Sequence, residues 1–130
     1  MCVRGASALG EVLERHPDAD VRVLVIWLPV LATDTGPPTD RVRGPLQDPR
    51  VIEYWDPQRW ASPRMMQRAN LMARAQGREP DFDPDAIAWD LIGLFPPGTV
   101  WEEPFPIPSW YGAPVVRSMD AVDEYLSGGK

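Results

Sequence analysis

The order of apolar and polar residues predicts helices and strands that alternate along the chain. Residues 3–16 place apolar side chains at helical spacing and are followed by Pro17, which predicts a helix over 3–16. The run VRVLVIWLPVL at 21–31 is rich in β-branched residues and becomes continuously apolar. Such a run is typical of a strand buried on both faces. A helix, a turn and a buried strand form the second half of a βαβ unit.

The rest of the chain predicts two more strands, a hairpin and two helices. Residues 32–50 are polar and rich in Pro and Gly, which favours a loop with a short helical turn around 40–42. The further elements, in order, are a strand at 51–56, an amphipathic helix beginning at Ser62-Pro63, a strand at 86–95, a Pro96–Gly98 turn, a return strand at 99–103, an irregular proline-rich segment at 104–114, and a closing helix with Asp120 as its N-cap.

Composition limits the classes of protein that fit this pattern. With 130 residues we expect one domain over 1–130, and 44% hydrophobic residues can form a core. Thirteen basic and nineteen acidic residues give a net charge of −6, which argues against a nucleic-acid partner. No apolar run approaches the roughly 20 residues that span a membrane, and residues 1–10 lack a signal-peptide pattern. We therefore predict a cytoplasmic location for the chain as written.

The single cysteine, Cys2, is the sharpest candidate for chemistry. One cysteine excludes an internal disulfide, and with His16 as the one histidine no structural zinc site or other cofactor is expected. On one helix Cys2 and His16 would lie about 21 Å apart, so they cannot form a pair. A helix N-terminus stabilises a thiolate, and Arg4 would add to this effect. The alternative is that Cys2 is merely an exposed terminal residue.

Polar and aromatic residues at the ends of the predicted strands are weaker candidates. Trp27 and Pro29 lie at the C-terminal end of the first strand, where open α/β sheets bind ligands. Trp89 is a further candidate to face a substrate, although most of the six tryptophans are expected to be core or loop-anchoring residues. Asp34 and Asp56 follow strands and fit either a polar site or a turn.

Several segments together resemble the thioredoxin-like superfamily. CVRGASALGEVL resembles the second cysteine of its C-x-x-C motif and the helix after it, and LIGLFPPGTVW resembles its hairpin. IWLPVLATD, DPRVIEYWD and WDLIGLFPPGTVW are similar, in this order, to a little-characterised group of bacterial thioredoxin-like proteins, and they cover 31 of the 130 residues. The resemblance implies a three-layer α/β fold whose mixed sheet has a C-terminal β-hairpin and a closing helix.

The same resemblance implies thiol–disulfide oxidoreductase-like chemistry with a protein or small-molecule thiol or disulfide as partner. Cys2 would be the resolving thiol. The strand that precedes this helix in the family, and the first residue of the motif three positions before Cys2, are not in the sequence. We therefore expect an incomplete N-terminus, either from a wrongly assigned start or from a selenocysteine codon read as a stop, which would make the protein a selenoprotein.

A second departure from the family falls at Asp90. The family places a cis-proline directly before the hairpin strand, facing the thiols, and the equivalent position here lies near Asp90. An acid there would disfavour a thiolate by like-charge repulsion or would accept the thiol proton. Catalytic activity therefore stays open. The alternative is a non-catalytic binding or scaffold module whose contact surface is Trp27, Trp89 and residues 104–114.

Overall fold

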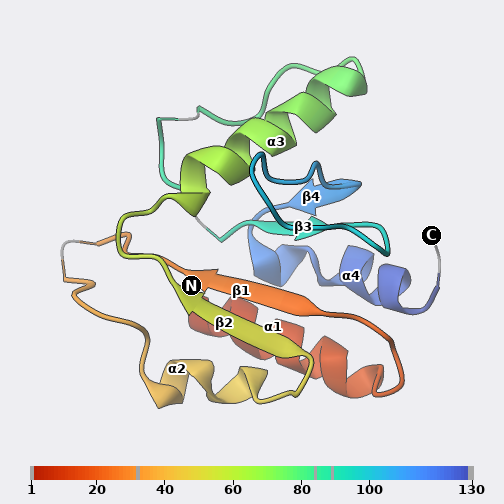
Figure 1. The fold of residues 1–130 in the computed structure, drawn as a ribbon. Helices are drawn as coiled ribbons and strands as arrows, with labels where there is room; N and C mark the ends of the chain where they lie inside the picture. The colour runs from red at the N-terminus through yellow and green to blue at the C-terminus, as the bar shows by residue number, and fades with distance from the viewer. Residues whose placement is uncertain (1, 32, 84, 89, 129–130) are drawn as a thin grey trace.

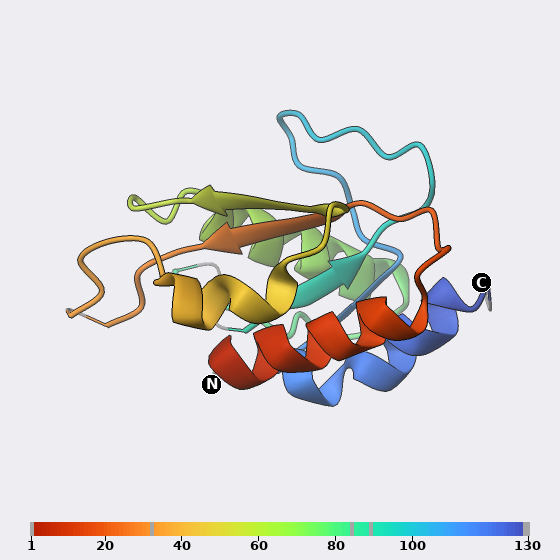
Figure 2. The same ribbon diagram turned by 90° about the horizontal axis from the view of Figure 1, so that it is seen from below.

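The computed structural model describes residues 2–31, 33–83, 85–88 and 90–128, which form an α/β structure. Its helices and strands are, in order, α1 (Cys2–Arg15), β1 (Val23–Trp27), α2 (Asp40–Arg43), β2 (Val51–Trp55), α3 (Ala61–Ala75), β3 (Ile92–Leu94), β4 (Trp110–Gly112) and α4 (Met119–Leu126). Short 3₁₀ turns cover Gly44–Leu46 and Val115–Arg117. Helices α1 and α4 lie on one side of the strands and α3 lies on the other (Figures 1 and 2).

The four strands form two separate sheets instead of the one mixed sheet that we predicted. β1 pairs with β2 in parallel, in register from Val23 opposite Val51 to Trp27 opposite Trp55. β3 pairs with β4 in antiparallel fashion, with Leu94 opposite Trp110. Within the described residues, no hydrogen-bonded ladder joins β1 to β3. The sheet is therefore split between its first and third strands.

The predicted hairpin is wrong in its second strand. The return strand is β4, and not residues 99–103, which form no strand and include Val100 with 65% of its surface exposed. The predicted third strand, 86–95, is ordered as a strand only over β3. Ser109 N donates to Leu94 O at 2.8 Å, so the chain returns to β3 only after a long excursion beyond the Pro96–Gly98 turn.

The core lies between α1, α4 and one face of the strands. Buried side chains of α1 (Ala6, Leu9, Val12 and Leu13) cluster with Leu46 and Val122. Val23, Val25 and Trp27 of β1 pack against this cluster, because alternate residues of a strand point to the same side. The other face of this sheet is less covered, with Ile52 at 39% and Tyr54 at 53% exposure. All five residues of β1 are half-buried, so the full burial of β1 on both faces that we predicted is not observed.

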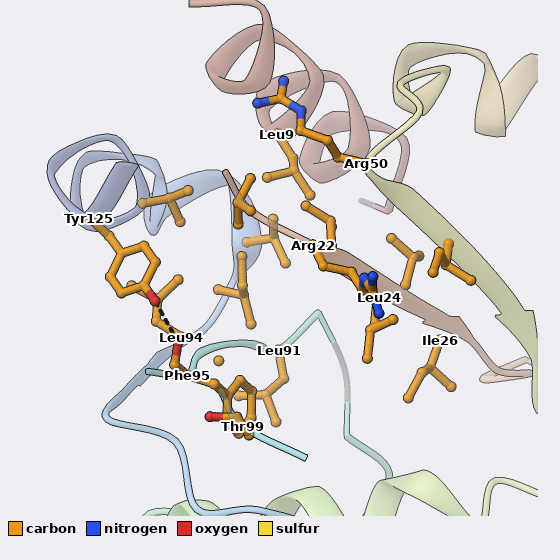
Figure 3. A pocket seen from close by; sticks show the side chains of 18 of the residues that line it. Leu9, Arg22, Leu24, Ile26, Arg50, Leu91, Leu94, Phe95, Thr99 and Tyr125 are labelled. Carbon is orange, nitrogen blue, oxygen red and sulfur yellow. Dashed lines mark hydrogen bonds between the residues drawn. The ribbon is translucent and has the colours of Figure 1, made fainter. Parts of the chain in front are cut away.

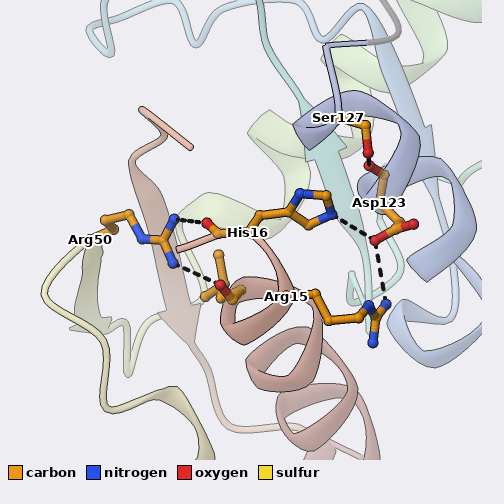
Figure 4. Close-up of polar contacts among 6 residues, drawn as sticks. Arg15, His16, Arg50, Asp123 and Ser127 are labelled. Atoms are coloured by element: carbon orange, nitrogen blue, oxygen red, sulfur yellow. Dashed lines mark hydrogen bonds and ion pairs between the residues drawn. The ribbon is translucent and has the colours of Figure 1, made fainter. Parts of the chain in front are cut away.

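Arg50 closes the C-terminal end of α1. The last carbonyls of a helix have no partner within the helix, and Pro17 prevents α1 from continuing. The Arg50 guanidinium donates to the carbonyl oxygens of Leu13 (2.9 Å) and His16 (2.7 Å) (Figure 4). It also donates to the carbonyl oxygen of Ala19 (3.1 Å). The same side chain donates to Asp48, at 2.8 Å between Nη2 and Oδ2. One side chain thus ties the start of β2 to the end of α1.

The Asp48–Arg50 pair should make stability depend on acid pH. Hydrogen bonds from the Arg50 side chain and backbone lower the pKa of Asp48 from 3.8 to about 2. A carboxyl whose pKa is lowered by folding stabilises the folded state above its unfolded pKa, and this contribution is lost as pH falls through the folded pKa. We expect the free energy of unfolding to fall between pH 3.8 and about 2, and to fall less in Asp48→Asn. Urea unfolding across this range measures the difference, and parallel curves for the two proteins would contradict it.

Helix α3 begins one residue before the predicted cap. The first backbone N–H of the helix, that of Ala61, donates to Asp56 Oδ2 at 2.9 Å. Asp56, and not Ser62, therefore provides the side-chain acceptor at this end of the helix. Ser62 instead binds the segment after the helix, where its Oγ accepts from Ala88 N at 2.6 Å. Asp34 likewise serves as a turn residue whose carboxylate accepts backbone amides at 2.8 and 2.9 Å.

The segment after α3 is fastened to the same helix. Asn70 Nδ2 donates to Phe82 O at 2.8 Å, and Phe82 N donates to Asn70 Oδ1 at 3.1 Å. The ring of Phe82 also contacts Tyr111 of β4, with 5.6 Å between ring centroids. In the closing helix α4, Asp120 lies inside the first turn, and Ser118 occupies the N-cap position that we had predicted for Asp120.

Candidate functional site

A mainly apolar cavity of about 1830 Å³ lies between the two sheets. Its lining residues come from β1, β3, α1 and α4 and from the beginning of α3, which contributes Met65. Figure 3 shows Leu24 and Ile26 of β1 on one side of it and Leu91 and Leu94 on the other. This volume exceeds the roughly 300–1,000 Å³ of common small-molecule pockets.

The first turns of α1 lie at this cavity, close to Asp90. Cys2 is the first residue of α1, and Gly5 and Ala6 line the cavity. Gly5 packs closely, since a Cβ there would lie 3.1 Å from Val115 Cβ and 3.2 Å from Asp90 Oδ1. The structure therefore brings the Asp90 carboxylate to the beginning of the helix that starts at Cys2.

Asp90 is held in an unusual conformation. Its φ is +57°, in the left-handed region that few residues other than glycine adopt but in which Asp is enriched. Asp90 Oδ1 accepts from Val115 N at 3.3 Å. Oδ2 is out of contact with solvent and has no hydrogen-bond partner among the described residues. Because buried polar atoms almost always find a partner, this oxygen is the clearest unsatisfied acceptor at the site.

Trp27 is held by side chains of the neighbouring strand and of α2. Its indole Nε1 donates to Glu53 Oε1 at 2.9 Å, and Arg43 binds the same carboxylate, with 3.0 Å between Nη2 and Oε2. The hydrogen bond from Arg43 is the main cause of the lowered pKa of Glu53. Trp27 is half-buried against the α1 core and also borders the cavity. Its position is therefore fixed by packing and by this charged pair.

The remaining predicted residues are not brought together. Arg4 is exposed on the first turn of α1. Pro29 is half-buried two residues beyond β1, and its neighbours Leu28 and Val30 border the cavity. Trp89 lies outside the described residues. Of the predicted set, Asp90 alone has a described side chain against the beginning of α1.

The sequence did not identify Gly5 and Val115 as residues of the site. A glycine inside a helical pattern is a signal for close backbone approach, so Gly5 carried a usable signal. Val115 lies 110 positions further along the chain, and no local pattern connects the two. The Glu53–Arg43 pair that holds Trp27 was missed for the same reason, because its members come from different elements.

Several properties of the described residues complete this picture. In the parts of the chain that the structure describes, no group of three or more His, Cys, Asp or Glu side chains is placed to hold a metal ion. No helix among these residues has the length and apolar character needed to cross a membrane. Comparisons with protein-family models, with curated proteins and with solved structures give no match to this chain.

Proposed function

We propose that this protein carries out thiol-based redox exchange through Cys2, in the manner of thiol–disulfide oxidoreductases. The observation that carries the proposal is the placement of the Asp90 carboxylate against the first turn of α1, the helix that Cys2 begins. The amides of the first helical turn have no partner within the helix and favour a thiolate. The unpartnered Asp90 Oδ2 supplies an acceptor for the thiol proton. A substrate disulfide would come from a protein or from a small molecule.

The proposed exchange step balances as follows. Asp90 takes the proton from Cys2, and the Cys2 thiolate attacks one sulfur of a disulfide. A new S–S bond forms, the old one breaks, and the leaving sulfur departs as a thiolate that takes up the proton. In a full cycle Cys2 would be the resolving thiol. It would then attack a mixed disulfide that already holds the substrate.

The single exchange step can be tested on residues 1–130. We expect folded protein mixed with glutathione disulfide to form one mixed disulfide per chain and release one glutathione, measured by intact mass. The reaction should be about tenfold faster at pH 7 than in the same chain unfolded in urea, after correction for the effect of urea on free cysteine. Cys2→Ser should form none. Equal rates in the folded and unfolded chains would show that Cys2 is only an exposed thiol and would contradict the proposal.

Asp90→Asn distinguishes the two effects that an acid can have at this site. If Asp90 accepts the thiol proton, the variant should react more slowly than the parent at pH 7. If its charge mainly repels the thiolate, the variant should react faster. We expect the slower rate. Asp56→Asn is the matched control, since Asp56 caps α3 and is not placed at the start of α1.

The second candidate is a non-catalytic binding module, and the cavity of about 1830 Å³ is the observation that favours it. The two proposals differ in what an N-terminally extended protein should do. Thiol-dependent reduction of insulin that is lost in Cys2→Ser supports the redox function. An extended protein that folds but shows no thiol-dependent turnover leaves the binding module.

A further inference from the structure

Strand β2 is the outer strand of the parallel sheet and has one free edge. Figure 2 shows it on the side of β1 that is turned away from β3. Val23 N donates to Arg50 O at 2.9 Å, so Arg50 directs its backbone groups toward β1. Because backbone groups alternate in direction along a strand, those of Val51, Glu53 and Trp55 point outward.

This edge carries none of the features that commonly protect exposed strands from pairing, which are lysine, proline and bulges. The sequence of β2 is VIEYW, and it pairs with β1 in unbroken register. Its one charged side chain, Glu53, is bound by Arg43, with 3.0 Å between Oε2 and Nη2. On the other face of the strand Ile52 and Tyr54 are 39% and 53% exposed. An apolar edge of this kind is a site for strand pairing.

The backbone groups of this edge match those of the same strand in a second copy. A two-fold axis at Glu53 makes the two β2 strands antiparallel. Glu53 N of each copy then donates to Glu53 O of the other, and Trp55 N donates to Val51 O of the other. Val51 N takes no part, because it already donates to Asp48 O at 3.0 Å. The pairing therefore uses groups that the fold leaves free.

The side chains also match in this register. Ile52 lies opposite Tyr54 of the second copy, and pairs of β-branched and aromatic residues stabilise sheets. On the other face the two Glu53 carboxylates lie side by side, which is unfavourable for bare acids. Each carboxylate is bound by Arg43 of its own chain and accepts from Trp27 Nε1 at 2.9 Å. The axis thus brings together two ion pairs, and this self-complementarity favours a second copy over an unrelated strand.

We propose that two copies of this protein associate through antiparallel pairing of their β2 strands, which forms one sheet in the order β1, β2, β2, β1. The proposal does not depend on the chemistry of Cys2. Sedimentation under reducing conditions tests it without a contribution from an intermolecular disulfide. We expect the mass of residues 1–130 to rise from one chain to two between about 1 μM and about 1 mM.

Hydrogen exchange locates the interface in the unmodified protein. Over the same range of concentration the exchange of the Glu53 and Trp55 amides should slow by about tenfold or more, because both become bonded in the dimer. A protein that stays monomeric at every concentration overturns the proposal. So does a dimer in which these two amides exchange as fast as in the monomer, since its interface would then lie elsewhere.

Two lysine variants provide a matched comparison. Ile52 and Leu71 are 39% and 40% exposed, but Leu71 lies on α3. Ile52→Lys places a charge against Tyr54 of the second copy and should raise the dissociation constant of the dimer by about tenfold or more. Leu71→Lys should leave it unchanged, and equal dissociation constants for the two variants would overturn the proposal. If circular dichroism shows that Ile52→Lys does not fold, the exchange measurement on the unmodified protein decides.

Discussion

Replacing Gly10 by alanine is expected to destabilise the protein by about 2–3 kcal/mol. In an ordinary helix interior this substitution stabilises, because glycine is about 1 kcal/mol less favourable than alanine. Here a Cβ would lie 2.2 Å from the carbonyl oxygen of Pro45 and 3.1 Å from its carbonyl carbon. These are backbone atoms that no side-chain rotation can move. Gly10→Ala must therefore push the 3₁₀ turn Gly44–Leu46 away from α1.

Gly10→Ala is expected to destabilise the protein, whereas glycine-to-alanine substitutions in helices ordinarily stabilise, so the direction of the change alone tests the contact with Pro45. Gly44→Ala is the matched control in the same contact region, since nothing lies within 4 Å of a Cβ at Gly44. We expect the control to be neutral or slightly stabilising. Urea unfolding of the parent and of both variants measures the free energies. A Gly10→Ala protein as stable as the parent would show that the backbones of α1 and Pro45 are not in close contact.

Replacing Arg50 by alanine is expected to cost about 3 kcal/mol, because hydrogen bonds to a charged donor contribute about 1.5–3 kcal/mol and the Asp48 carboxylate loses the guanidinium that binds it. The side chain binds three carbonyl oxygens near the end of α1 and the carboxylate of Asp48. Arg50→Lys should recover only part of the loss. It keeps the charge, but it has no planar fork that reaches several acceptors at once.

An exposed pair at the same end of α1 provides the control for Arg50. Arg15 approaches Asp123 at 3.4 Å, and the two side chains are 55% and 42% exposed (Figure 4). Exposed pairs contribute at most about 1 kcal/mol, so Arg15→Ala should change stability far less than Arg50→Ala. Thermal unfolding followed by circular dichroism compares the two. If the two variants lose the same stability, the charge of Arg50, and not its binding of carbonyl oxygens, is its main contribution to the stability of the fold.

Local patterns in the sequence predicted the local elements well. The helix over 3–16, the strand at 51–56 and the short turn around 40–42 correspond to α1, β2 and α2. In each case the signal lies within the element: apolar spacing with a following proline for α1, and β-branched and aromatic residues for β2.

The errors concern pairing over long distances in the sequence. Residues 99–103 follow the tight turn at Pro96–Gly98 and were expected to form the return strand, yet β3 pairs with Trp110–Gly112. Gly112 allows this close return, because a Cβ there would lie 2.4 Å from the Trp110 ring and 2.6 Å from Ser118 Oγ. The packing of the Gly5 turn against Asp90 and Val115 is equally invisible to a local pattern.

The bonds that fasten α3 to the segment after it also bear on how the protein unfolds. Ser62 and Asn70 hold that segment at both of its ends, so helix and segment share one set of contacts. None of the residues in the cluster around Leu9 and Leu13 belongs to them. Regions that share few contacts with the main core open as separate cooperative units. The α3 region is therefore expected to open as one unit in native-state hydrogen exchange, at a lower free energy than the α1 core.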